Sequence, residues 1–354
     1  MQLFDNVKKS ILDATFVRRD VHDSSATKQY YNDLIESLHI DNFPLLSIDT
    51  IEKRTYFVES NGRFFLVFDH YLLEVMDFLN HAVSDDVPTS VVELFFYRLF
   101  SEECYLQNKI PSALEFISKY INGLEEIIAW YKEKDSSRLP DILFIQQAFL
   151  IAHEVFHFYV NSNPSSRQTG IASKKQFLNR IQVYASDRDE LTAYAMRGAI
   201  NNPHMAEECL CDSTGVIQAI DVGKKLKKLD IVESGVAATL AILDQFTIST
   251  IQDVVKFSGD ILYERTQNLL NFRLLHMKAF TSLYIKEYGT PSDLKCYQTQ
   301  VEMYHEQWMK KVFGPLMKML FESNDLLKDH KGPLTTNPEE LKTIRAFLKR
   351  IYRY

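Results

Sequence analysis

Apolar side chains recur at helical spacing along most of this chain. Four stretches repeat them every three or four residues, and a fifth stretch is apolar along much of its length. These patterns predict helices over residues 25–39, 70–83, 89–107, 111–134 and 140–161. In the last of them, Pro140 and Asp141 suit a first helical turn. From Ile142 to Ile151 the run that follows is apolar apart from Gln146 and Gln147, so we expect a buried helix.

A strand pattern appears in one place. Residues 55–60 and 63–68 are rich in aromatic and β-branched side chains, and Asn61 and Gly62 stand between them. Asn-Gly between two such runs is typical of a two-residue hairpin turn. We therefore expect one β-hairpin, the only clear sheet signal in the chain.

The second half of the chain predicts one polar segment and then further helices. Residues 163–180 are polar and contain proline, glycine and several serines, which predicts a surface loop, and residues 186–200 predict a short helix. Asn202 and Pro203 suit the start of a helix that should run to about residue 229. The rest predicts helices to the end, with breaks near 289–291 and 331–333.

Composition narrows the class of protein. The 354 residues carry a net charge of −7 and are 46% hydrophobic, enough to bury a full core. Because no basic stripe appears, we expect no nucleic-acid partner. Neither a signal-peptide pattern at residues 1–9 nor a run of about twenty apolar residues is present, so we expect a cytoplasmic protein with no membrane span. Four irregularly spaced cysteines fit reduced thiols better than a disulfide framework.

The chemistry of the chain is concentrated in the apolar helix over 140–161. It contains the HExxH sequence His153-Glu154-Val155-Phe156-His157. Residues four apart share one face of a helix, so both imidazoles can point at one Zn²⁺ ion. Glu154 is then placed to activate a zinc-bound water by taking its proton. Zinc would also satisfy two histidines that a buried helix otherwise leaves without partners.

Such a site needs a third protein ligand, and Glu208 is our choice. Asp212 lies four residues later on the same helical face, where it can accept the N–H of a ligand histidine. Acidic residues also favour first helical turns, which accounts for a glutamate at 207 or 208 but not for Asp212. His204 is a rival third ligand. A closed site with Cys209 and Cys211 is a weaker alternative, since residues two apart face different ways.

The order of these residues resembles the HExxH…ExxxD arrangement of gluzincin metallopeptidases, especially the ImmA-like and Lit-type phage-exclusion peptidases and relatives of the prenyl-protein proteases. In the last group the second motif often reads Glu-x-x-Ala-Asp, and Cys211 replaces that alanine here. The resemblance covers about a third of the chain. It implies one Zn²⁺ per chain held by His153, His157 and Glu208, with Glu154 as general base. Asp212 would then contact a metal ligand without binding the ion itself.

This resemblance also implies a fold. We expect an α+β, predominantly α-helical protein with a zincin-like core and a small sheet over residues 1–229, and a helical region packed on it over 230–354. An edge strand of the hairpin at 55–68 would hold an extended protein or peptide substrate. A residue that steadies the oxyanion is not identified by a motif; the candidates are Tyr194, His204, Tyr263, Arg265, Arg273 and His276.

Two other functions stay open at the level of sequence. The chain could be a catalytically silent zinc-fold protein that binds or regulates a protein partner. It could also be a helical scaffold in which HExxH occurs by chance, and such a protein would bind no stoichiometric metal.

Overall fold

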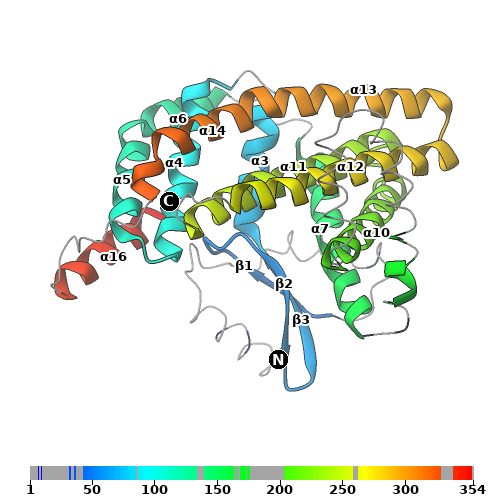
Figure 1. Ribbon diagram of the computed structural model, residues 1–354, viewed down its shortest axis with the longest axis horizontal. Helices are drawn as coiled ribbons and strands as arrows, with labels where there is room; N and C mark the ends of the chain where they lie inside the picture. Colours follow the sequence, from blue (N-terminus) through cyan, green and yellow to red (C-terminus); the bar gives the residue numbers. More distant parts are fainter. Residues whose placement is uncertain are drawn as a thin grey trace.

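The computed structural model describes residues 43–84, 87–133, 139–162, 168–172, 203–257, 262–327 and 338–352, together with a few further positions (7, 9, 32, 36, 165, 174 and 175). Figure 1 shows the arrangement of the elements. In chain order these are β1 (Leu45–Ile48), β2 (Thr55–Ser60), β3 (Arg63–Asp69), α3 (His70–Ser84), α4 (Thr89–Leu106), α5 (Ile110–Asn122), α6 (Leu124–Glu133), α7 (Leu139–Ser162), α10 (Pro203–Lys225), α11 (Ile231–Lys256), α12 (Leu262–Tyr288), α13 (Pro291–Trp308), a π-helical segment (Met309–Phe313), α14 (Gly314–Glu322), α15 (Asn324–Leu327) and α16 (Pro338–Tyr352).

The predicted hairpin is present, within a larger sheet than expected. β2 and β3 pair antiparallel through the Asn-Gly turn, where Asn61 has φ +53° and Gly62 has φ +72°. Both left-handed values are those that a type I′ turn requires. β1 adds a third strand, parallel to β3, which gives the order β1-β3-β2. The sequence reading missed β1, because four residues show too short an alternation and their partner strand lies far along the chain.

Most of the predicted helices agree with the structure, including the two that carry the motifs. Two predictions were wrong. The helix expected over 111–134 is two helices, α5 and α6, separated at Gly123, and glycine is a poor helix former. Part of the segment 163–180, expected as a loop, is helical at its described positions, where the Thr169 hydroxyl donates to the Ser165 carbonyl. The helices expected at 25–39 and 186–200 fall almost wholly outside the described residues, as does the break at 331–333.

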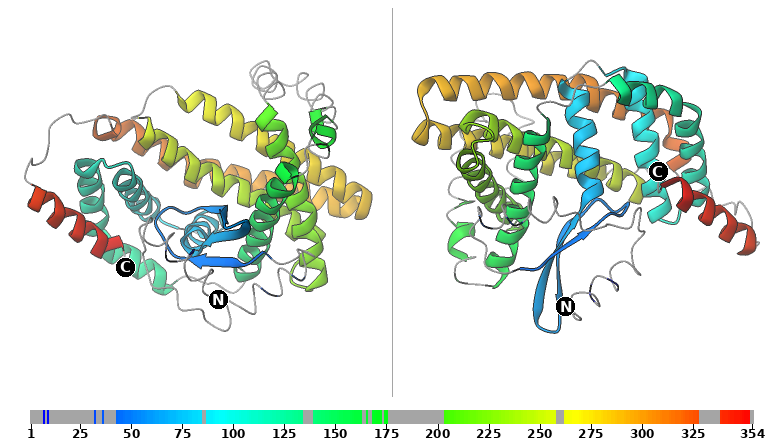
Figure 2. Two further views of the ribbon diagram at one scale, coloured as in Figure 1. Left: turned by 90° about the horizontal axis from the view of Figure 1, so that it is seen from below. Right: turned by 180° about the vertical axis from the view of Figure 1, so that it is seen from behind.

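Two apolar helices, α7 and α11, form the centre of the helical layer. α7 lies beside α10, and α11 packs against α7, α10, α12 and α13 (Figures 1 and 2). The larger of two buried clusters runs from Ile51 to Tyr352, so it includes side chains from before and after residue 230. A smaller cluster joins Val7 to Leu46, Ile48, Phe65 and Val67 of the sheet. Pro140–Val160 and Ile231–Lys256 are long and apolar enough to cross a membrane, yet 61% and 89% of these windows are buried inside the protein. Burial of that kind is what core helices show.

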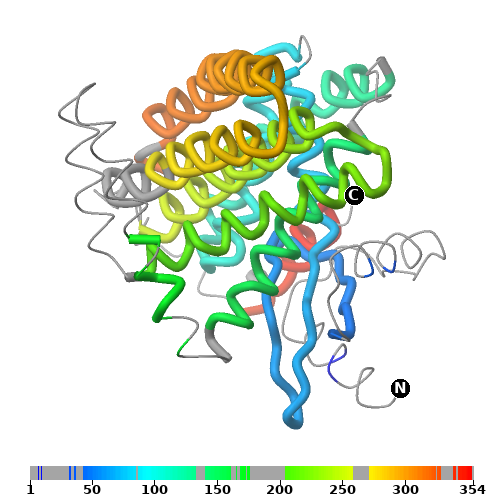
Figure 3. The backbone as a smooth tube through the Cα atoms, turned by 90° about the vertical axis from the view of Figure 1, so that its right-hand side faces the viewer, coloured from blue at the N-terminus to red at the C-terminus, as the bar shows by residue number. Residues whose placement is uncertain are grey.

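Close contacts set the position of α7 against its neighbours. On one side, Gly215 of α10 lies so near α7 that an added Cβ would be 2.8 Å from the ring of Phe149. On the other side lies the sheet, whose hairpin projects away from the helices (Figure 3). Aromatic side chains of this hairpin pack on the C-terminal end of α7. Phe57 and Phe64 place their ring centres 5.2 and 4.5 Å from that of Phe158. The fold is therefore α+β and mainly α-helical, as expected.

Candidate metal centre

Three potential metal ligands meet where α7 and α10 run side by side. His153 and His157 lie one turn apart on α7, and Glu208 faces them from the second turn of α10. The Nε2 atoms of the two histidines are 3.1 Å apart. The carboxylate oxygens of Glu208 lie 3.5 Å from Nε2 of His153 and 3.3 Å from Nε2 of His157. A tetrahedral ion about 2.0–2.1 Å from each ligand holds its ligands about 3.3 Å apart, so the spacing fits zinc.

The other ring nitrogen of each histidine faces a carboxylate of α10. Nδ1 of His153 is 3.0 Å from Oδ1 of Asp212, and Nδ1 of His157 is 3.3 Å from Oε1 of Glu207. A carboxylate favours the tautomer that keeps the hydrogen on Nδ1. Both Nε2 atoms then point a lone pair at the same place as the carboxylate of Glu208. Three acceptors that converge on one point can hold a cation.

The charged groups around the two histidines also favour positive charge at this site. Four carboxylates lie around the two histidines: Glu154, Glu207, Glu208 and Asp212. Burial alone would lower the pKa of His153, but the carboxylates of Asp212 and Glu208 outweigh it and raise that pKa to about 10. Burial also works against the charge on Glu208, yet bonds from both histidines hold its pKa well below the usual range. The carboxylates thus favour positive charge on this spot, whether a proton or a metal supplies it.

Arg273 of α12 completes the cluster. Its Nε and Nη2 atoms donate to the two oxygens of Asp212 at 3.0 and 2.7 Å, and its Nη1 lies 3.3 Å from Glu208. This guanidinium, together with the hydrogen bond from His153, keeps the pKa of Asp212 well below its ordinary value despite complete burial. A helix from beyond residue 230 therefore holds both acidic residues of the second motif.

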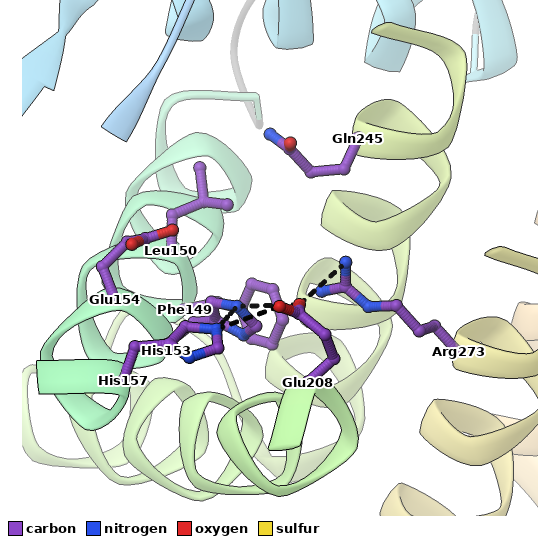
Figure 4. Close-up of a pocket in the computed structure, with 8 residues that line it drawn as sticks. All are labelled: Phe149, Leu150, His153, Glu154, His157, Glu208, Gln245 and Arg273. Carbon is purple, nitrogen blue, oxygen red and sulfur yellow. Dashed lines mark hydrogen bonds and ion pairs between the residues drawn. The ribbon is translucent and has the colours of Figure 1, made fainter. Parts of the chain in front are cut away.

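The site opens into a pocket of about 340 Å³. Figure 4 shows the residues that line it: Phe149, Leu150, His153, Glu154, His157, Glu208, Gln245 and Arg273. Glu154 lies beside the first histidine, and burial raises the pKa of its carboxyl above the ordinary value, although the two histidines oppose that effect. A carboxylate with a raised pKa in a pocket is suited to take up a proton and return it.

Several other candidates from the sequence lie elsewhere. His204 is exposed at the start of α10 and is outside the group of ligand atoms. His276 is buried behind α10, with Nε2 3.3 Å from both the Ser213 hydroxyl and Nζ of Lys174, and it does not line the pocket. Burial, followed by the charge of Lys174, lowers the pKa of His276 to about 3.

The remaining alternatives gain no support from the described residues. Cys209 and Cys211 are buried, burial raises the pKa of both thiols, and neither belongs to the group of ligand atoms. Tyr194 lies outside the described residues, as do the side chains of Tyr263 and Arg265. Of the oxyanion candidates, Arg273 is the one found among the residues that line the pocket.

Two polar residues of this site were missed by the sequence reading. The sequence does not single out Glu207, because the preference for acidic first turns accounts for a glutamate at 207 or 208. Adjacent helical residues also point about 100° apart, and the contact with His157 depends on how α7 and α10 pack. Gln245 has no motif around it and lies on an otherwise apolar helix; only the packing of α11 across from α7 brings it to the pocket.

Comparison of this chain with protein-family models, with curated proteins and with solved structures finds no match.

Proposed function

We propose that this protein is a zinc-dependent metallopeptidase that hydrolyses peptide bonds in a protein substrate in the cytoplasm. The observation that carries the proposal is the convergence of three lone-pair donors, from His153, His157 and Glu208, in a pocket that Glu154 also lines. The order of these residues resembles gluzincins, and their spacing of 3.1 to 3.5 Å fits a zinc ion.

The donor set suits zinc in kind as well as in distance. Two imidazoles and one carboxylate are the ligands of catalytic zinc sites, which leave a fourth position open. A zinc ion bound here supplies Lewis acidity, which makes water a better nucleophile and a carbonyl a better electrophile. The side chain of Glu208 is 33% exposed and lines the pocket, so an ion held by this residue would be accessible from the pocket.

The chain's own residues carry the rest of the reaction. Glu154 accepts the proton of the attacking water and later delivers it to the leaving amine, so the carboxylate ends as it began. Arg273 has five N–H donors and uses three of its nitrogens on Asp212 and Glu208. Two N–H groups remain for the oxygen that gains negative charge in the transition state.

The sheet offers a surface for an extended chain. β2 is an edge strand that pairs with β3 alone among the described strands, and Phe57 of this strand stacks on Phe158, one helical turn beyond Glu154. Free main-chain groups on such an edge can pair with a peptide. Under the proposal, β2 aligns the substrate along α7, in keeping with the edge strand that the gluzincin resemblance implies.

The first test is the metal content of the purified chain. Elemental analysis should find one zinc per chain in the wild type and in Asp221→Asn, a control on the exposed part of α10, and much less in Glu208→Ala. Equal zinc in Glu208→Ala would reject Glu208 as a ligand. No zinc in any variant, even after zinc is added, would reject the metal centre and leave a helical scaffold.

A second test separates a peptidase from a silent zinc protein that binds a partner. A peptide library from digested cell protein is incubated with zinc-loaded wild type and with Glu154→Gln, and new termini are read by mass spectrometry. A peptidase yields new termini with wild type only, while both proteins keep zinc. No cleavage by either protein, with zinc bound, favours the binding or regulatory alternative.

A further inference from the structure

One polar side chain of the pocket has no part in the proposed chemistry. Gln245 projects from α11 toward α7, across the pocket from the histidines (Figure 4). Its neighbours along the helix, including Asp244 and Phe246, are buried. The amide of Gln245, between these buried neighbours, lies at the pocket.

Hydrogen bonding distinguishes Gln245 from the other polar groups around the pocket. His153, His157, Glu208 and Arg273 bond to one another, while Gln245 bonds to none of the described residues. The contrast with Asp244 next to it is clear, because that carboxyl accepts a hydrogen bond from Gln146 in the core. A half-buried amide that faces a pocket has both a donor and an acceptor to offer.

We infer that Gln245 binds a main-chain peptide group of the substrate and holds the neighbouring scissile bond across from Glu154; this inference rests on the proposed function. A peptide group also presents one donor and one acceptor, so a side-chain amide can pair with both. None of the other seven residues that line the pocket carries an amide side chain. Gln245 thus favours peptides over esters or free acids of similar size.

Two probes isolate this contact without knowledge of the natural substrate. Acetohydroxamate carries a zinc-binding group alone, and the hydroxamate of N-acetyl-alanyl-alanine adds two peptide groups with small side chains. Their binding to the zinc-loaded full chain is measured by calorimetry for wild type, Gln245→Ala and Gln252→Ala. Gln252 is the matched control, because it is half-buried on α11 two turns further on and is not part of the pocket lining.

The expected result is selective. Gln245→Ala should bind the dipeptide hydroxamate about tenfold more weakly, the effect of one or two lost hydrogen bonds, and acetohydroxamate as well as wild type does. Gln252→Ala should match wild type with both probes. Unchanged binding of acetohydroxamate also shows that Gln245→Ala is folded and holds its metal.

Other outcomes overturn the inference in ways that can be told apart. If Gln245→Ala retains the full affinity for the dipeptide hydroxamate, Gln245 does not bind peptide groups, and the metal centre stands. If the wild type gains no affinity from the two peptide groups, the same conclusion follows. If the zinc-treated wild type does not bind acetohydroxamate, the proposed metal centre fails and the inference fails with it.

Discussion

Each histidine of the candidate metal centre faces a carboxylate from the helix that also carries Glu208. Asp212 could be assigned to this role from sequence, because four residues separate it from Glu208 on one helical face. Glu207 could not, since its contact with His157 depends on how α7 and α10 pack. The 3.3 Å distance between Nδ1 of His157 and Glu207 makes that contact a testable part of the site.

The change Glu207→Gln should weaken zinc binding by about tenfold without abolishing it. The amide keeps the size of the glutamate but removes the charge that favours the Nδ1–H tautomer of His157, and outer partners of this kind contribute 10–100-fold to metal affinity. Competition with a coloured chelator measures the effect. Asp221→Asn, on the same helix, should bind zinc as wild type does; equal affinity in Glu207→Gln would show that Glu207 does not orient the histidine.

At the scale of elements, a series of buried side-chain hydrogen bonds connects three helices next to the site. Asn80 of α3 and Gln146 of α7 exchange two amide hydrogen bonds of 2.8 and 3.2 Å, and Gln146 also donates to Asp244 of α11 at 3.1 Å. Burial raises the pKa of Asp244 well above its ordinary value of 3.8, with the bond from Gln146 opposing it weakly. The folded protein therefore retains a proton that the unfolded chain releases.

This proton gives the stability of the protein a defined dependence on pH. Above about pH 4 the Asp244 carboxyl keeps its proton in the folded state and loses it in the unfolded state. The contribution of this group to the free energy of unfolding therefore falls by about 1.4 kcal/mol per pH unit until the folded pKa is reached. Asp244→Asn has no such titration, and its stability relative to wild type should rise with pH. Urea unfolding from pH 4 to pH 8 at constant zinc measures this; parallel profiles for the two proteins would contradict it.

A comparison of the individual helices and strands shows how far the sequence could predict the fold. α7 and α10 were predicted because long apolar periodicity and helix-start residues act locally, and the hairpin was predicted because Asn61-Gly62 encodes its own turn. β1 and the helical positions described within 163–180 were missed for the opposite reason. Their structure depends on contacts with distant parts of the chain, and four-residue strands or polar helices carry little local signal.

At the scale of the whole molecule, the region beyond residue 230 helps to form the candidate site. α11 is buried along most of its length, and α12 supplies Arg273. A domain boundary at 229/230 was expected from sequence because no motif lies beyond it. The contact of Arg273 with Asp212 and the larger buried cluster argue that neither part would form the metal centre alone.

A chain of residues 1–229 should therefore fail to bind zinc in a stable fold. Without α11, the apolar face of α7 is exposed, and without α12 the buried carboxylate of Asp212 loses its positive partner, which is a severe loss for a buried ion pair. Thermal unfolding followed by circular dichroism should show no cooperative transition, and elemental analysis should show no zinc. A truncated chain that melts cooperatively with one zinc bound would establish 1–229 as an independent domain.

The spread of these residues along the chain also sets an order of events during folding. His157 and Glu207 are 50 residues apart, and Asp212 and Arg273 are 61 apart. Such distant groups meet only after α7, α10 and α12 have packed, so the polypeptide must largely complete its folding before an ion could bind at this site. Contacts that form after the rate-limiting step slow unfolding and leave the folding rate nearly unchanged. Zinc would then slow the unfolding of this protein and have little effect on how fast the chain folds.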